Sequence, residues 1–204
     1  TDQGGLGFSK ESVGVIKSTI TPLLYILPIL SGAIADRYGY KKVLTFSFIV
    51  MSTGYFLTSL STSYALVFAS LLLMVLGAGC FKPIISGTIA RETNESNSTL
   101  GFGIFYWSIN MGAFIFPLLL VPYLKSISWS YIFIMAAVGT GWLLFLNLAV
   151  YKEPARPAVV GKVTDLLRNV VLVLKDVRFM SMIVIYSGFW ILYFQMFDTV
   201  LWYL

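Results

Sequence analysis

The stretch GAIADRYGYKK, residues 32–42, joins two long apolar segments, Val13–Ala35 and Val43–Ser61. Crossing a bilayer takes about 20 helical residues at a rise of 1.5 Å each, and both segments are long enough. The string between them is short, charged and carries a glycine where the chain must reverse. The pattern therefore predicts two membrane-spanning helices joined by a tight turn.

Each conspicuous residue of this turn has a physical reading. Gly32 lets two helices approach closely, and Gly39 permits the tight reversal. Asp36 lies where a carboxylate can face the N-terminus of a neighbouring helix. An ordinary turn would need neither the Asp nor this glycine spacing, so we interpret the string as a conformational loop. Its basic residues hold it on the cytoplasmic side: Arg37, Lys41 and Lys42.

Four further apolar stretches follow, and the composition fits a chain that lies mostly in lipid. Hydrophobic residues make up 58% of the 204 residues and charged residues 11%, against roughly 25% in soluble domains. We therefore predict an all-α integral membrane protein with six transmembrane helices. The other spans are Tyr64–Ala90, Thr99–Leu124, Trp129–Tyr151 and Phe179–Leu204.

The basic residues set the orientation of these spans. With the 36–42 loop inside, Lys10 and Lys125 fall outside, and Lys17 and Lys82 lie within spans. All other Lys and Arg residues fall on the inner side, which is a strong positive-inside bias. We expect a multi-pass protein of the cell membrane, with the loop 36–42 and the segment 152–178 in the cytoplasm.

The segment 152–178 interrupts the pattern of short loops. A helix stop at residues 153–157 (EPARP) precedes residues 162–176, where apolar residues recur at helical spacing beside charged ones. This predicts an amphipathic helix on the inner membrane surface, either a linker between two bundles or a regulatory or partner helix. We favour the linker. It divides the chain into residues 1–151, 152–178 and 179–204.

Several spans carry polar or amphipathic side chains at nearly one depth. Lys82 lies about 12 Å from the inner end of its span, and the others lie about 10 to 16 Å in. Snorkelling of the lysine, aromatic packing and helix–helix hydrogen bonding are the alternative readings. Secondary transporters bind their substrates near the midplane, so we interpret this level as a binding site. The residues are Tyr25, Lys82, Tyr106, Asn110 and Trp190.

The 32–42 string resembles the loop signature of the major facilitator superfamily, G-x-L-A-D-R-x-G-R-K, with Ile34 and Tyr40 as departures. Four more strings resemble motifs of its proton-coupled oligopeptide transporters. On that resemblance the chain covers helices two to seven of a twelve-helix fold, and the remaining helices lie outside it, as an opening Thr also suggests. The strings are YILP at 25–28, GAGCFKPIIS at 77–86, FYWSINMGAF at 105–114 and FWILYFQ at 189–195.

The resemblance implies a transporter that imports di- and tripeptides by alternating access, coupled to protons. Lys82 would bind the peptide carboxylate and take part in proton coupling. The family acid of helix seven corresponds to Phe194, and Asp198, one turn further on, is the candidate to replace it. The partners are peptide, protons and the lipid bilayer. The residues that would line the pocket are Tyr25, Tyr106, Asn110 and Trp190.

Other classes of function fit the sequence less well. The chain has no His and one Cys, Cys80, so it offers neither a His base nor a Cys- or His-rich metal site, and no cofactor is expected. It also lacks a phosphate-binding loop and a basic stripe for nucleic acid, so we expect no enzyme and no nucleic-acid partner. Two alternatives remain: a carrier for another solute, such as an amino acid, nitrate or an organic anion, or a non-transporting membrane partner or scaffold.

Overall fold

A computed structural model describes residues 6–154, 168 and 171–198. The chain divides into two compact units, residues 1–158 and 159–204, which are described separately. The first unit contains α1 (Lys10–Tyr38), α2 (Tyr40–Leu60), α3 (Tyr64–Glu92), α4 (Ser98–Ile115), the π-helical segment η1 (Phe116–Leu120), α5 (Val121–Ile127) and α6 (Trp129–Ala149). The second contains α8 (Val177–Asp198).

The helices confirm the predicted all-α class and the six spans. Six helices are long and apolar enough to cross a membrane, and α4, η1 and α5 together form one of them, Ser98–Ile127. The last predicted span, Phe179–Leu204, is described as far as Asp198. Most of the predicted amphipathic helix at 162–176 lies outside the described residues. Of that segment, residue 168 and residues 171–175 are helical.

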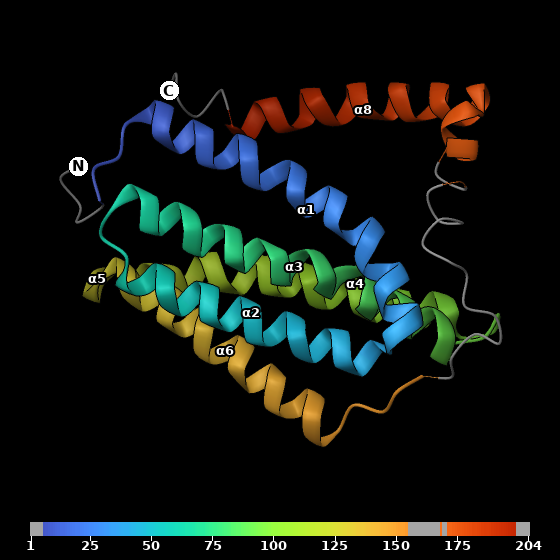
Figure 1. Ribbon diagram of the computed structural model, residues 1–204, viewed down its shortest axis with the longest axis horizontal. Coiled ribbons are helices and arrows are strands. Elements are labelled where there is room, and N and C mark those ends of the chain that lie inside the picture. The colour runs from blue at the N-terminus through green and yellow to red at the C-terminus, as the bar shows by residue number, and fades with distance from the viewer. Residues whose placement is uncertain (1–5, 155–167, 169–170, 199–204) are drawn as a thin grey trace. The chain divides into compact units, whose positions relative to one another are not determined.

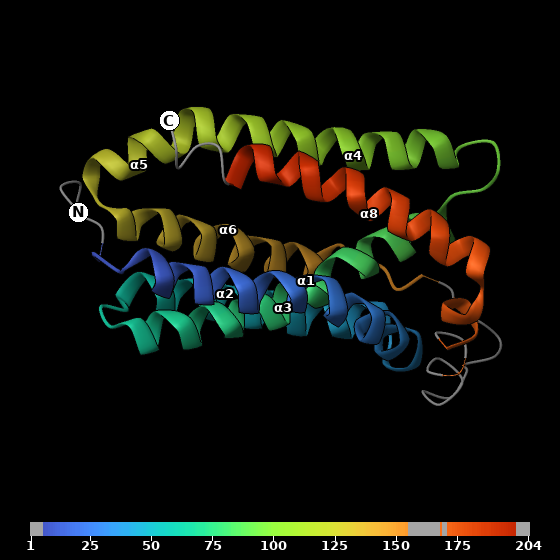
Figure 2. The same cartoon turned by 90° about the horizontal axis from the view of Figure 1, so that it is seen from above.

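In the first unit α2 packs against α3 on one side and α6 on the other, and α1 packs against α3. Figures 1 and 2 show these four helices side by side, whereas α4 meets the rest of the unit mainly near its ends. The buried apolar core includes Tyr40, Leu44, Phe48 and Ile84. It lies at the ends of α1, α2 and α3 that meet at residues 36–42.

Small residues set the distances between these helices. A Cβ on Gly54 would lie 2.6 Å from the backbone nitrogen of Met74, and one on Gly77 would lie 2.6 Å from the carbonyl oxygen of Ser47. The Ser47 hydroxyl donates to the Gly77 carbonyl at 2.7 Å. Close backbone approach with interhelical hydrogen bonds is how helices associate in lipid. The same approach was predicted at Gly32, but an added Cβ there meets no atom within 4 Å among the described residues. No helix in the described part of the chain approaches Gly32 that closely, and the Gly32 prediction stays a prediction.

The fourth span contains a widened turn that the hydrophobic pattern does not predict. At η1 the Val121 N–H donates to the carbonyl of Phe116, five residues back. Pro117 and Pro122 lie in and just after this turn, and each lacks the N–H that a regular α-helix would use. In the π-helical turn the carbonyls accept from N–H groups five residues ahead, so the chain stays helical although the prolines donate no hydrogen bonds.

Gly39 alone separates α1 from α2, and its backbone explains why glycine stands there. Its φ is +104° and its ψ is +142°, in a region that side chains with a Cβ rarely adopt. Its N–H still donates to the carbonyl of Ala35 at 2.9 Å, which ends α1. The predicted tight reversal is confirmed.

Replacing Gly39 by Ala is expected to lower the free energy of unfolding by about 1–2 kcal/mol, because the left-handed backbone becomes strained. The measurement is the thermal unfolding midpoint of the full-length protein in detergent. Gly14→Ala is the matched control, since an added Cβ on this helical glycine meets nothing within 4 Å. An equal midpoint for the Gly39 and Gly14 variants would contradict this account of the turn.

Candidate functional site

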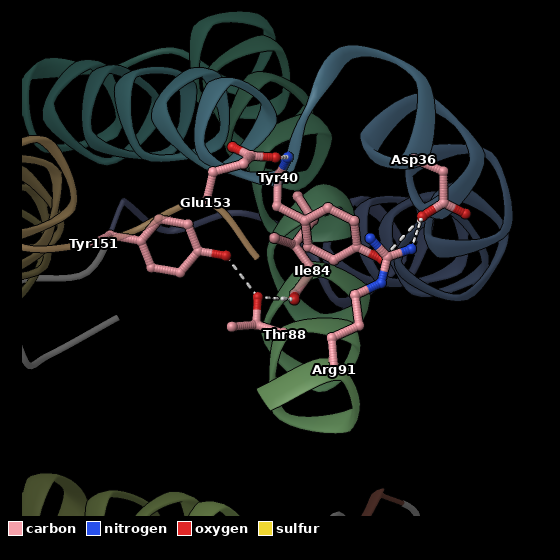
Figure 3. Close-up of polar contacts among 7 residues, drawn as sticks. All are labelled: Asp36, Tyr40, Ile84, Thr88, Arg91, Tyr151 and Glu153. Carbon is pink, nitrogen blue, oxygen red and sulfur yellow. Dashed lines mark hydrogen bonds and ion pairs between the residues drawn. The ribbon is translucent and has the colours of Figure 1, made fainter. Parts of the chain in front are cut away.

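A cluster of polar side chains joins the ends of α1, α2 and α3 at the 36–42 turn (Figure 3). The Arg91 guanidinium lies 2.6 Å from Asp36 Oδ1, and the Tyr40 hydroxyl donates to the same oxygen at 3.0 Å. The guanidinium also lies over the Tyr40 ring, 4.4 Å from its centroid, which is a cation–π contact. Tyr40 is 6% exposed, so it anchors this cluster in the core.

Asp36 was predicted to face the N-terminus of a neighbouring helix; among the described residues its partner is another side chain, and the prediction stays a prediction. Its carboxylate pairs with Arg91, in the last turn of α3. The carboxylate at the N-terminus of α2 belongs instead to Glu153. Its Oε1 accepts from the Tyr40 N–H at 2.6 Å and its Oε2 from the Lys41 N–H at 2.8 Å.

Glu153 supplies what the local sequence of α2 lacks. The N-cap residue of α2 is Gly39, which has no side chain to accept a bond from the first turn. Free N–H groups at a helix N-terminus favour a negative charge, and Glu153 brings one from 113 residues further along the chain. A contact this remote in sequence is invisible to a search for local capping patterns.

Lys41 caps the opposite end of another helix, the C-terminus of α6. Its ammonium donates to the carbonyl of Leu148 at 3.0 Å and to that of Tyr151 at 2.8 Å, at the C-terminal end of α6. A cation there also interacts favourably with the helix dipole. Glu153, just after α6, therefore caps the start of α2, and Lys41, in the first turn of α2, caps the end of α6. Together these contacts hold the end of α6 against the start of α2.

Tyr151 connects the same region to α3. Its hydroxyl lies 2.6 Å from Thr88 Oγ1, and Thr88 Oγ1 also donates to the Ile84 carbonyl at 2.8 Å. Burial raises the pKa of the Tyr151 phenol above its ordinary value, while the Thr88 contact opposes that rise. The phenol is therefore neutral near pH 7 and can donate a hydrogen bond. In Figure 3 Tyr40 lies between the Asp36–Arg91 pair and the Tyr151–Thr88 pair.

The Asp36–Arg91 pair is expected to show a coupling energy of about 1 kcal/mol in a double-mutant cycle. Both side chains are partly exposed, 41% for Asp36 and 23% for Arg91, and this solvent access keeps the value modest. The cycle uses Asp36→Asn, Arg91→Gln and the double variant, with unfolding midpoints as the measurement. Additive effects of the two substitutions would contradict a direct interaction.

The residues predicted to bind substrate are placed on three helices of the first unit and on α8. Tyr25 on α1 is 67% exposed and Tyr106 on α4 is 57% exposed, and Lys82 and Asn110 are exposed as well. The Asn110 Nδ2 donates to the Tyr106 carbonyl at 2.8 Å, within its own helix. No hydrogen bond, ion pair or ring contact joins the side chains of these four residues among the described residues.

The predicted common depth holds only approximately for Tyr25 and Lys82. Gly79 fixes the register of α1 on α3: its Cβ would lie 2.5 Å from Leu27 Cβ, and its carbonyl accepts from Ser31 Oγ at 3.2 Å. The two helices run in the same direction (Figure 1). Lys82 is therefore level with residues well beyond Tyr25, and the two Cα atoms differ in depth by about 8 Å or more.

In the second unit Trp190 belongs to an aromatic cluster on α8. Its ring stacks on Phe194 with centroids 5.6 Å apart, and it meets Tyr193 edge-to-face at 5.4 Å. Trp190 itself is 43% exposed. Asp198 is the last residue of α8, and its side chain lies outside what the structure describes.

The described residues contain no group of three or more His, Cys, Asp or Glu that could hold a metal ion. The contacts observed in the polar cluster are an ion pair and the capping of helix ends. Sequence reasoning missed Arg91, Glu153, Tyr151 and Thr88. Two signals could have indicated the first two: an Arg at the end of the third span, and an acid immediately before Pro154 where the fifth span ends.

Comparison with known proteins places this geometry in a family. The family model described as Major Facilitator Superfamily matches residues 3–204. The di-/tripeptide transporter of Lactococcus lactis subsp. lactis is 31% identical over 147 residues, which cover 71% of this chain and 30% of that protein. The peptide transporter YePEPT of Yersinia enterocolitica is 30% identical over 162 residues, which cover 76% of this chain and 31% of that protein.

Solved structures give the same result. A crystal structure of a POT peptide transporter mutant with bound sulfate matches 97% of this chain and 40% of its own, with a TM-score of 0.70 and 25% identity. A POT family transporter in complex with 5-aminolevulinic acid matches 93% of this chain and 40% of its own, with a TM-score of 0.69 and 25% identity. The chain thus spans about 30% of the length of the curated relatives cited above.

Proposed function

The chain belongs to the major facilitator superfamily, and on that premise we propose that the whole protein imports di- and tripeptides by alternating access, coupled to protons. It is a multi-pass membrane protein. The proposal adds that it lies in the cell membrane with the loop 36–42 and the segment 152–178 in the cytoplasm. Residues 1–151 then supply helices two to six, and residues 179–204 supply the first helix of the second bundle.

The observation that carries this proposal is the agreement between relatives and motifs. Relatives named as di-/tripeptide transporters match about 70% of the chain, and they match the part that contains most of the predicted pocket residues. Structures of POT peptide transporters match nearly all of it. Fold alone would leave the substrate open, because one fold serves many functions.

The position of Lys82 supports a polar cavity along α3. Lys82 is exposed, and it lies ten residues before Glu92, the end of α3, or about 15 Å into the span. A charged side chain at that depth is costly against lipid but not against a water-filled path. An ammonium in such a path attracts a carboxylate, which every peptide carries at its C-terminus. Lys82 is therefore the proposed carboxylate-binding residue.

The other predicted residues complete the proposed pocket. Tyr25 and Tyr106 are exposed aromatic side chains on α1 and α4, and Asn110 lies one turn after Tyr106 on the same face. Trp190 would approach from the second bundle. An amide and phenols can hydrogen-bond a peptide backbone without selecting its side chains. This suits a carrier that accepts many di- and tripeptides.

Proton coupling in this proposal falls to Lys82 and Asp198. Phe194 stands where the family carries an acid, so Asp198, one turn further along α8, is the remaining carboxyl group of that helix. Binding of a carboxylate would favour the protonated form of Lys82, which links substrate and proton.

A second candidate function is import of another solute that carries both an amine and a carboxylate. Phe194 favours it, since the usual acid is absent, and one POT family neighbour is seen with 5-aminolevulinic acid.

The test is uptake of labelled dialanine by cells expressing the whole gene, challenged with excess unlabelled dipeptide, tripeptide, tetrapeptide, alanine, nitrate or 5-aminolevulinic acid. Competition by the dipeptide and tripeptide alone supports the first proposal. Uptake of labelled 5-aminolevulinic acid or alanine that dipeptides do not inhibit would replace it by the second.

A further inference from the structure

Pro83 interrupts the hydrogen-bond pattern of α3 immediately after Lys82. In a regular α-helix the Gly79 carbonyl would accept from the N–H of residue 83, and proline has no N–H to donate. A carbonyl without a donor inside a membrane span is costly, and a side chain of a neighbouring helix can supply the donor. The Gly79 carbonyl is therefore the acceptor in this turn that needs another donor.

A serine of α1 supplies it. The Ser31 hydroxyl donates to the Gly79 carbonyl at 3.2 Å, and Ser31 is 1% exposed. Its proton is shared with the Pro28 carbonyl, also at 3.2 Å, but in α1 that carbonyl has the N–H of residue 32 as its regular donor. The contact is possible because residue 79 is glycine: a Cβ there would lie 2.5 Å from Leu27 Cβ. Ser31 thus replaces the hydrogen bond that Pro83 removes.

Lys82 lies at the turn that Pro83 interrupts. It comes three residues after Gly79 and directly before Pro83, and it is exposed. Residues three apart are neighbours on a helix surface, and prolines bend helices where the hydrogen bond is missing. The direction that α3 takes at Pro83 therefore determines where the Lys82 ammonium lies.

We propose that Ser31 is a positioning residue for Lys82: its hydrogen bond to the Gly79 carbonyl holds the bend of α3 at Pro83 and thereby sets the place of the Lys82 ammonium. This inference rests on the carboxylate-binding role that the proposed function gives to Lys82. Ser31 acts through α3 and not on the peptide. Without its hydroxyl the buried Gly79 carbonyl loses this donor, and α3 changes its bend to reach another one.

A double-mutant cycle of Ser31→Ala and Pro83→Ala tests the contact without any substrate. Ser31→Ala should lower the unfolding midpoint of the full-length protein in detergent by about 2–4 °C, because a buried carbonyl loses its donor. In the Pro83→Ala background the N–H of residue 83 is restored, so the same substitution should lower the midpoint by about half as much or less. Equal losses in the two backgrounds would overturn the proposal.

A transport assay tests the effect on Lys82. Ser31→Ala should raise the KM for labelled dialanine by about fivefold or more and leave the maximal rate within about twofold, because binding of the carboxylate is what weakens. Ser47→Ala is the matched control: it removes a buried hydroxyl that donates to the Gly77 carbonyl at 2.7 Å, where the N–H of residue 81 remains as the regular donor. Its KM should stay within about twofold of the unmodified value. An equal change in KM for the two serine variants would overturn the role given to Ser31.

A labelling assay separates this inference from the proposed function. With Cys80 and any cysteine outside residues 1–204 replaced by Ala, Lys82→Cys places a single thiol at position 82. Its rate of modification by a water-soluble methanethiosulfonate should change by about fivefold or more on Ser31→Ala, and by less than about twofold on Ser47→Ala. An unchanged rate on Ser31→Ala would overturn the positioning role. A changed rate, in a protein whose unmodified form takes up no dialanine, would support that role and contradict peptide transport.

Discussion

Replacing Lys82 by Ala is expected to reduce proton-driven dipeptide uptake by at least about thirtyfold. Lys82 is the exposed cation deep in α3, and truncating one partner of a desolvated charge pair costs about 2–5 kcal/mol. The loss should appear both in binding of the peptide and in its accumulation. Uptake of labelled dialanine into proteoliposomes under an inward proton gradient is the measurement.

Two variants separate binding from coupling at this position. Lys82→Arg keeps the charge but cannot lose its proton, so it should support exchange of peptide across the membrane without driven accumulation. Lys17→Ala is the matched control, since Lys17 is the other lysine within a predicted span, near the opposite end of its helix. It should stay within about twofold of the unmodified protein. Dialanine uptake by the Lys82→Ala protein at the unmodified rate would remove Lys82 from the site.

Replacing Glu153 by Ala is expected to lower the free energy of unfolding by about 2–4 kcal/mol. Two hydrogen bonds from the first turn of α2 to a carboxylate would be lost, and hydrogen bonds to charged groups contribute about 1.5–3 kcal/mol each. Glu153 is only partly buried, so water would replace part of this contribution. The unfolding midpoint of the full-length protein, followed by intrinsic fluorescence, should fall by about 5 °C or more. The Lys41 N–H would lose its acceptor, and the contacts of the Lys41 ammonium with the end of α6 would not replace that bond.

The Glu153 prediction has a graded control and a matched one. Glu153→Gln keeps the length and one acceptor oxygen but loses the charge, so it should fall between Ala and the unmodified protein. Glu95→Ala removes an exposed acid in the turn between α3 and α4, and its midpoint should not change measurably. If the Glu153 and Glu95 variants unfolded at the same temperature, the capping role would be contradicted.

The sequence predicted the helices well because the bilayer leaves few choices. Every backbone group must be paired inside the membrane, so a long apolar stretch predicts a helix. The six spans agree with the structure to within a few residues over the described ranges. Gly39 was also predicted correctly, because a one-residue reversal between two helices needs a backbone conformation that glycine adopts readily.

The contacts between helices were predicted less well, because side-chain partners depend on packing rather than on local pattern. Asp36 is conspicuous in the sequence, but nothing nearby identifies Arg91, 55 residues away, as its partner. Glu153 was interpreted as part of the helix stop at residues 153–157, and its contact with the start of α2 becomes visible only in the folded chain. Gly32 seemed a packing residue, while Gly54 and Gly77 are the glycines at which α2 and α3 approach closely.

The predicted binding residues remain predictions for a related reason. Tyr25, Lys82, Tyr106 and Asn110 are exposed in the first unit, and a pocket between two bundles needs both bundles in place. The register at Gly79 also shows that counting residues from the end of a span misjudges relative depth. Span ends vary by several residues, whereas a packed contact fixes the level of two helices directly.

The most direct test of the central claim is uptake of a labelled dipeptide into proteoliposomes that contain the full-length gene product. We expect accumulation above the external concentration with an inward proton gradient, and loss of that accumulation when a protonophore collapses the gradient. Equilibration that is indifferent to the gradient would contradict proton coupling. Absence of dipeptide flux from protein shown to be folded would contradict peptide transport itself.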